Sequence, residues 1–154
     1  MRPDQSAPPQ PAPGVPRGST WPGSMDPLEV TLAAGLDAPA AARAAVTDWM
    51  AGHVSRTMLI DAELMVSELV ANSVRHSGAA ADAVLAVRAH ISADGLVLEV
   101  HDQGTGGSIR RRAPDMHAGD GFGLNIIEKL SRRWGVNRDA GTRVWVELAF
   151  APTA

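Results

Sequence analysis

One stretch, IDAELMVSELVANSVRHS from Ile60 to Ser77, constrains the fold of this chain more than any other. Its apolar residues recur with the period of an α-helix, which predicts an amphipathic helix of about five turns. At about 100° per residue, one broad side of that helix carries Ala62, Val66, Leu69, Val70 and Ser73, with Met65 and Val74 at its edges. We expect this side to face the protein core.

The other side of the same helix carries a narrow polar stripe. Asp61, Glu68, Asn72 and Arg75 follow one another at i, i+7, i+11 and i+14, and Glu68 and Asn72 are neighbours one turn apart. A carboxylate, an amide and a guanidinium in this arrangement suit a base, a metal ligand and a phosphate contact. The alternative is an ordinary solvated helix face, which is the commoner origin of such a pattern when it stands alone.

Periodicity also predicts the elements on either side of this helix. We expect a strand at 28–33. A helix should follow that runs through Ala40 to Met50, with Asp37 as its N-cap, Pro39 in its first turn and Gly52 as its C-cap. A β-hairpin follows, with strands near 85–91 and 96–102 and a turn at Asp94 and Gly95. A further helix is predicted from near Gly123 through Trp134, and Gly135 is expected to break it. Two strands follow, one around 136 and one at 144–150.

Asp102 stands out at the end of the second hairpin strand. It has the same parity as Leu96, Leu98 and Val100, so it continues an apolar strand face. Burying a carboxylate there is costly unless another group hydrogen-bonds it, so Asp102 is a candidate ligand-binding residue. The alternative is that Asp102 already lies in the turn and only caps it.

Residues 103 to 121 show little regular pattern and contain several glycines, and they lead into the sequence GDGFGLN. Loops of this length without regular structure are usually functional or disordered, and this one is predicted to be a lid. Bare glycine amides at a helix N-terminus form an anion site. A Walker loop is excluded because no lysine stands in place, and about twenty residues between Asp102 and the helix disfavour a Rossmann turn.

Composition limits the class of protein. The chain has 154 residues, 45% of them hydrophobic, which predicts one soluble domain. Seven of its eleven prolines lie in residues 1–25, which predicts a disordered tail with Trp21 as its one bulky apolar residue, ahead of a domain at 26–154. No signal sequence or membrane-spanning run is visible, and the absence of cysteine excludes disulfides and thiolate metal sites. We expect a cytoplasmic protein, and its net charge of −3 implies no general affinity for nucleic acid.

The order of the motifs resembles the GHKL superfamily of ATP-binding domains, which adopt the Bergerat fold and include gyrase and sensor histidine kinases. ELVANSVRH is similar to the N-box of that superfamily, DQGTG to its first glycine box and GDGFGL to its second. The likeness covers roughly residues 28 to 150, and is greatest to bacterial anti-sigma-factor serine kinases and their regulatory ATP-binding relatives. It implies an α/β two-layer sandwich with a mixed, mostly antiparallel sheet, about three helices on one face, and ATP between the layers.

The resemblance also implies a role for each matching residue. Glu68 corresponds to the general base, Asn72 to the magnesium ligand, Arg75 to a phosphate contact, and Asp102 to the acceptor for the adenine amino group. The remaining matches are the residues that pass close to the nucleotide or cradle its phosphates, and a threonine that helps to fix adenine: Gly104, Gly106, Gly119, Gly121, Gly123, Leu124 and Thr142. One departure is that the predicted lid carries no lysine, so arginines would have to supply its charge.

The function implied by the resemblance is an ATP- and Mg²⁺-dependent serine/threonine kinase. It would bind a sigma factor and phosphorylate the anti-anti-sigma protein that antagonises it, without direct contact to nucleic acid or membrane. Two alternatives stay open, namely an ATP-binding switch without kinase activity and a hydrolase in which Glu68 activates water. Homodimer formation is also left open.

Overall fold

The structure is a computed structural model, and it describes residues 26–76, 83–92, 95–102, 121–137 and 141–149. Within these ranges the chain forms three helices and five strands. In chain order they are β1 (Leu28–Ala33), α1 (Ala38–Met50), α2 (Arg56–His76), β2 (Val84–Ile91), β3 (Gly95–Asp102), α3 (Gly121–Leu130), β4 (Arg133–Asn137) and β5 (Thr142–Ala149). The tail predicted at 1–25 and the lid predicted at 103–121 lie outside the described residues, apart from Gly121.

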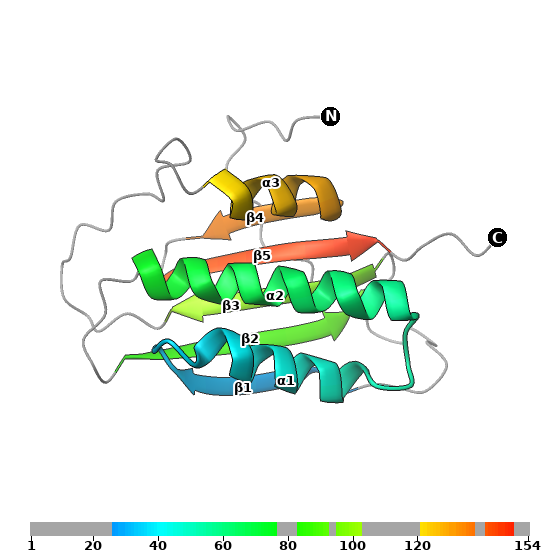
Figure 1. The fold of residues 1–154 in the computed structure, drawn as a ribbon, viewed down its shortest axis with the longest axis horizontal. Helices are drawn as coiled ribbons and strands as arrows, with labels where there is room; N and C mark the ends of the chain where they lie inside the picture. The colour runs from blue at the N-terminus through cyan, green and yellow to red at the C-terminus, as the bar shows by residue number, and fades with distance from the viewer. Residues whose placement is uncertain (1–25, 77–82, 93–94, 103–120, 138–140, 150–154) are drawn as a thin grey trace.

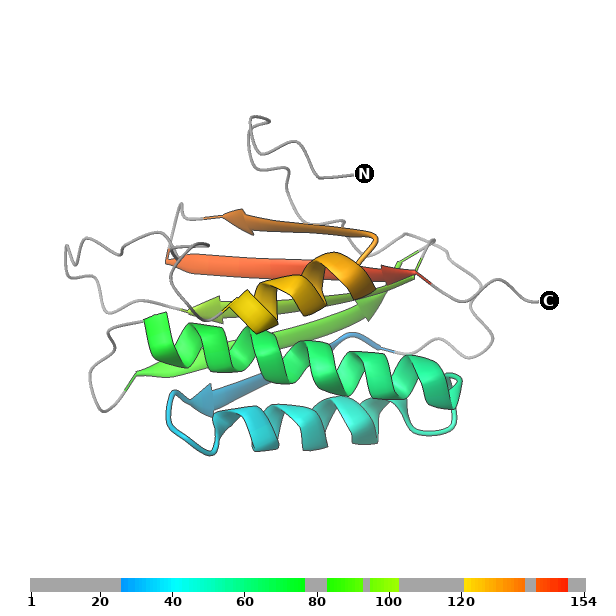
Figure 2. The ribbon, with the colours of Figure 1, turned by 45° about the horizontal axis from the view of Figure 1, so that its top comes forward.

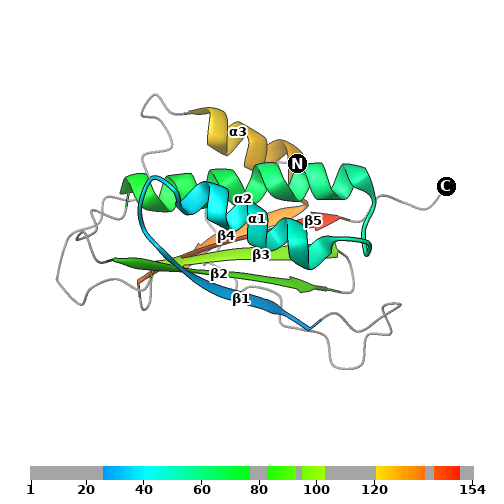
Figure 3. The same ribbon diagram turned by 60° about the horizontal axis from the view of Figure 1, so that its bottom comes forward.

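The five strands form one sheet in the order β1-β2-β3-β5-β4 (Figure 1). Every neighbouring pair is antiparallel. All three helices lie on the same side of this sheet (Figure 3). The predicted two-layer sandwich with helices on one face is therefore confirmed, and its described strands are antiparallel throughout. None of the described helices is long and apolar enough to cross a membrane.

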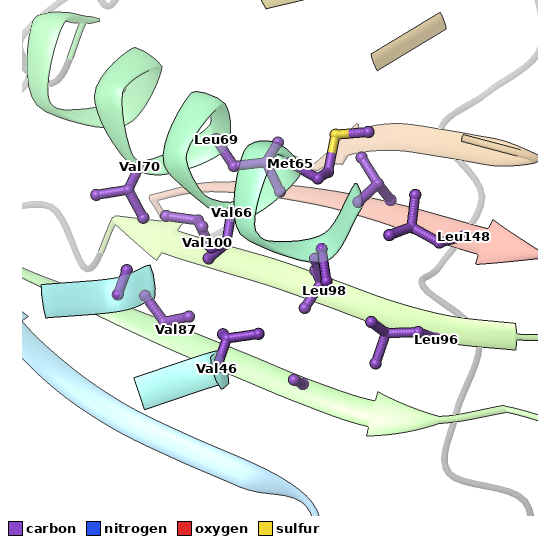
Figure 4. Packing of buried hydrophobic residues seen from close by; sticks show 14 of the residues in the cluster. Val46, Met65, Val66, Leu69, Val70, Val87, Leu96, Leu98, Val100 and Leu148 are labelled. Carbon is purple, nitrogen blue, oxygen red and sulfur yellow. The ribbon is translucent and has the colours of Figure 1, made fainter. Parts of the chain in front are cut away.

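The core lies between α2 and the middle of the sheet. Figure 4 shows apolar side chains of α2 directed at those of β3 and β5. The buried set includes Met65, Val66, Leu69 and Val70 from the helix, and Leu98 from β3. Met65, predicted at the edge of the apolar side, is fully buried. Each such side chain contributes about 1.5–3 kcal/mol through burial, so the apolar side of α2 fixes which side of the helix stays accessible.

The hairpin of β2 and β3 is closed by a side chain as well as by the ladder. Ser92 donates its backbone N–H to the carbonyl oxygen of Gly95 at 2.7 Å, and the Ser92 Oγ accepts from the Gly95 N–H at 3.0 Å. Gly95, predicted in the turn, is the first residue of β3. A Cβ there would lie 1.9 Å from the carbonyl oxygen of Leu148, so the pairing of β3 with β5 requires glycine.

The first helix begins at Ala38, directly after the predicted N-cap. Asp37 holds the N-cap position, but its side chain makes no capping hydrogen bond. Pro39 in the first turn favours helix initiation because its φ is already helical and it needs no intrahelical N–H partner there. Gly52 follows the helix with φ of 77°, the left-handed conformation expected just past a helix end.

The helix predicted from near Gly123 through Trp134 is wrong at its C-terminal end. The helix starts at Gly121 and ends at Leu130, and Trp134 lies in β4 opposite Val146. After Ser131 donates to Ile127 in a last helical hydrogen bond, the Arg132 N–H donates instead to the carbonyl of Glu147 at 2.7 Å. Pairing with β5 therefore ends the helix. Gly135 does not break it, and lies within β4.

Candidate functional site

Four elements bring the predicted site residues to one end of the molecule. The C-terminal ends of α2 and β3, the start of β5 and the N-terminal end of α3 lie together there (Figures 1 and 2). This happens because α2 and β3 run in the same direction, while α3 and β5 run the opposite way (Figure 1). Residues up to 70 positions apart in sequence, such as Asn72 and Thr142, consequently share this end.

The polar stripe of α2 is only partly open to solvent. Glu68 and Asn72 are half-buried, whereas Arg75 is exposed. The Nη2 of Arg75 donates a hydrogen bond to Oδ1 of Asn72 at 2.5 Å, so these two side chains act as a pair. The carboxylate of Glu68 has no hydrogen bond or ion pair within the described part of the chain. An amide oxygen, a guanidinium and an unengaged carboxylate thus stand along one side of the helix.

Contacts with α1 hold α2 in register. Arg43 donates to the Ser67 Oγ at 3.0 Å, and Thr47 donates to the Glu63 carboxylate at 2.8 Å. Ser67 and Glu63 therefore face α1, which leaves the adjacent stripe with Glu68 on a different side of the helix. These positioning residues cannot be predicted from local sequence, because the paired positions are 24 and 16 residues apart and no local pattern links them.

Asp102 is 5% exposed and is the last residue of β3. It pairs with Leu85 of β2 and Thr142 of β5, so it belongs to the strand, and the alternative of a turn cap is wrong. Its parity places it on the helix-facing side, in line with Leu98 and Val100 of the core. Asp102 and Thr142 are thus direct cross-strand neighbours, close enough for one ligand to contact both.

The N-terminal end of α3 is the fourth part of the site. The first turn of α3 contains Gly121, Gly123 and Leu124, and its backbone N–H groups have no partners within the helix. Such groups attract phosphate oxygens, and the helix dipole adds to the attraction. Gly104, Gly106 and Gly119, which were also predicted to contact nucleotide, lie outside the described residues.

The donor set fits ATP and Mg²⁺. A buried carboxylate suits the exocyclic amine of adenine, and a helix N-terminus and a guanidinium suit phosphates. No cluster of three or more His, Asp or Glu side chains occurs in the ranges that the structure describes. Oδ1 of Asn72 is the side-chain oxygen that would hold a magnesium ion together with phosphate oxygens, since Mg²⁺ takes few protein ligands plus substrate phosphates.

Comparison with known proteins agrees with this geometry. Among solved structures, the chain is similar to the RsbU and RsbW domains of Rv1364c from Mycobacterium tuberculosis, with a TM-score of 0.57 and 25% sequence identity. The likeness covers 84% of this chain and 34% of that one, so the match spans about a third of the chain in that structure. No curated protein matches the sequence significantly.

The family comparison covers most of the chain. Residues 32–148 match the family model described as the histidine kinase-like ATPase domain. These residues run from within β1 to within β5, so they include every element that contributes to the site. The chain therefore belongs to the family of histidine kinase-like ATPase domains.

Proposed function

We propose that this protein is an ATP-dependent serine/threonine kinase. It would bind a sigma factor and phosphorylate the anti-anti-sigma protein that antagonises this binding. The observation that supports this most is the position of Glu68. It lies one helical turn from Asn72, and its carboxylate is unengaged among the described residues, whereas nearby Glu63 is occupied by Thr47. A general base needs a free lone pair beside the phosphate-binding groups.

Each residue has one task in this mechanism. Bound ATP supplies the phosphoryl group that is transferred. Asp102 accepts a hydrogen bond from the adenine amino group and so sets the position of the nucleotide. Asn72 holds magnesium through Oδ1, and Arg75 turns from Asn72 towards the phosphates. Glu68 accepts the proton of the attacking hydroxyl. Positioning and charge neutralisation of this kind account for most of the catalysis in phosphoryl transfer.

The exposure of the stripe favours a protein as the phosphate acceptor. Glu68 and Asn72 are half-buried and Arg75 is exposed, so water reaches the described part of the site. A carboxylate base serves a serine hydroxyl or a water molecule equally well, but freely exchanging water is poorly positioned for in-line attack. A docked partner places one hydroxyl and excludes solvent, and positioning of this kind contributes several kcal/mol. We therefore expect the protein without a partner to hydrolyse ATP slowly, and to transfer phosphate rapidly to a docked partner protein.

The test is mass spectrometry of candidate antagonist proteins after incubation with the full chain and Mg-ATP. One serine or threonine should gain a phosphate, and Glu68→Gln should slow this by about 10²–10⁴-fold while retaining ATP binding. Glu63→Gln is the matched control on the same helix, and should leave the transfer rate nearly unchanged. Rapid phosphate release without a partner would favour the hydrolase instead. ATP-dependent changes in partner affinity without any phosphorylation would favour the non-catalytic switch.

A further inference from the structure

The side of the sheet that faces away from the helices, here called the helix-free face, carries an unusual set of side chains. Strand alternation places on it Ala86 and Arg88 of β2, Val97 and Glu99 of β3, and Arg143 and Trp145 of β5. Arg88 lies opposite Glu99, and Glu99 lies opposite Trp145. Two ion pairs hold the arginines, Arg88 with Glu29 at 3.2 Å and Arg143 with Glu99 at 3.4 Å.

These side chains are buried, although no helix covers them. Val97 is 0% exposed, Ala86 1% and Trp145 4%, and none of the three belongs to the core between the helices and the sheet. Figure 3 shows all three helices on the other side of the sheet. A single layer of strands leaves its outward side chains partly open to water. The burial of this face therefore calls for a cover that the described helices do not provide.

The same face holds polar N–H groups without acceptors. Nε1 of Trp145, Nε of Arg88 and Nε of Arg143 are buried, and none has a hydrogen-bond partner among the described residues. The indole of Trp145 is fixed over β4, because a Cβ at Gly135 would lie 2.8 Å from Nε1. A buried donor without a partner costs about 1–3 kcal/mol, so three on one face point to a ligand that is rich in acceptors.

A proline-rich segment has the matching chemistry. Proline lacks an N–H, so such a segment presents carbonyl acceptors with few competing donors. In the polyproline II conformation these carbonyls stay free of internal hydrogen bonds, and proline rings pack on aromatic side chains such as tryptophan. Residues 1–25 of this chain contain seven prolines, including Pro8, Pro9, Pro11 and Pro13.

The attachment point of that segment allows it to reach the face. It joins the domain just before β1, which is an edge strand of the sheet. Trp49 donates to the carbonyl of Asp26 at 2.8 Å and so anchors the chain at the residue that directly follows the segment. Twenty-five residues span up to about 80 Å when extended, whereas five strands are only about 20 Å across. We propose that residues 1–25 dock on the helix-free face as a polyproline II segment, with their carbonyls accepting from Trp145, Arg88 and Arg143.

The absence of cysteine from the chain allows a direct test. A nitroxide spin label on Ala12→Cys in the full chain should broaden away the NMR signal of the Trp145 indole N–H. The amides of Leu64 and Ala71, on the far side of the helix layer, should remain sharp and report that the protein is folded. Reducing the nitroxide should restore the indole signal, which makes each sample its own control.

A second variant tests the chemistry of the contact. In Ala12→Cys with Pro8, Pro9, Pro11 and Pro13 changed to serine, the segment has the same length but no polyproline preference, so the Trp145 signal should persist. An unbroadened indole in the first protein, or equal broadening in the serine variant, would overturn the proposal. Broadening of an isotope-labelled chain by a separate spin-labelled chain would overturn it as well, because the cover would then come from a second copy.

Discussion

Asp102 is the residue whose environment is most informative about the ligand. It continues the apolar strand face of Leu98 and Val100, it is 5% exposed, and it pairs directly with Thr142. A carboxylate in that position accepts hydrogen bonds and donates none. Adenine offers an amino group, whereas guanine offers a carbonyl oxygen at the equivalent position. In the proposed role, Asp102 would therefore select adenine over guanine as well as contribute to affinity.

Replacing Asp102 with asparagine tests this assignment. The fold should persist, because the amide has nearly the same shape, but ATP affinity should fall by at least about tenfold through loss of a charge-assisted hydrogen bond. Titration calorimetry with ATP measures the change. Glu99→Gln is the matched control, since Glu99 lies on the same strand but on the helix-free face. Equal affinity of the Asp102 variant and the unmodified protein would contradict the adenine assignment.

Among the elements, α2 and β3 decide the geometry of the site. The apolar side of α2 packs on β3, and its pairs with α1 fix its rotation, so the polar stripe is left on the side away from both. The strand β3 has two ladder partners, β2 and β5. Displacing either element would separate Asn72 from Asp102, which come from opposite layers of the sandwich.

The start of β3 gives a prediction about this element. Gly95→Ala would place a Cβ 1.9 Å from the backbone oxygen of Leu148, which cannot rotate away as a side chain could. The strands must separate locally, and unfolding in urea should show a loss of stability of more than about 2 kcal/mol.

Gly35→Ala is the control for this substitution, since nothing lies within 4 Å of its Cβ position and its φ is ordinary. It should change stability by less than about 0.5 kcal/mol. Similar effects at Gly95 and Gly35 would mean that the close approach of β5 to β3 does not require glycine.

At the scale of the whole molecule, the site joins the two layers. Asn72 and Arg75 belong to the helix layer, whereas Asp102 and Thr142 belong to the sheet. A nucleotide that contacts both layers binds the folded state and not the unfolded chain, so binding adds directly to the free energy of unfolding.

Mg-ATP at about 100 times its Kd should therefore raise the free energy of unfolding by about 2.7 kcal/mol. Asn72→Ala should reduce the difference between Mg-ATP and ATP alone, because the proposed magnesium ligand is lost. Thermal unfolding with each ligand measures both quantities, and Arg56→Ala serves as a control, since Arg56 is exposed at the opposite end of α2 from Asn72. If the Asn72 variant keeps the full magnesium-dependent increment, Asn72 is not the metal ligand.

The sequence alone was enough to predict the elements whose patterns are local. Alternation defined β1 and the hairpin, and the period of 3.6 residues defined α2 together with its polar stripe. The parity of Asp102 also held, because strand side chains alternate whatever the partner strand is. The family resemblance then assigned roles to these residues, and the match to histidine kinase-like ATPase domains confirms the family.

Tertiary structure decided what local patterns leave open. Trp134 has the right spacing from Ile127 and Leu130 to continue a helix, but hydrogen bonds to Glu147 in β5 turn the chain into a strand. Glycine often ends a helix, but Gly135 lies within β4, where its lack of a side chain leaves room for the indole of Trp145. These outcomes depend on partners that are ten or more residues away. Periodicity within one segment carries no information about the strand against which that segment will pair.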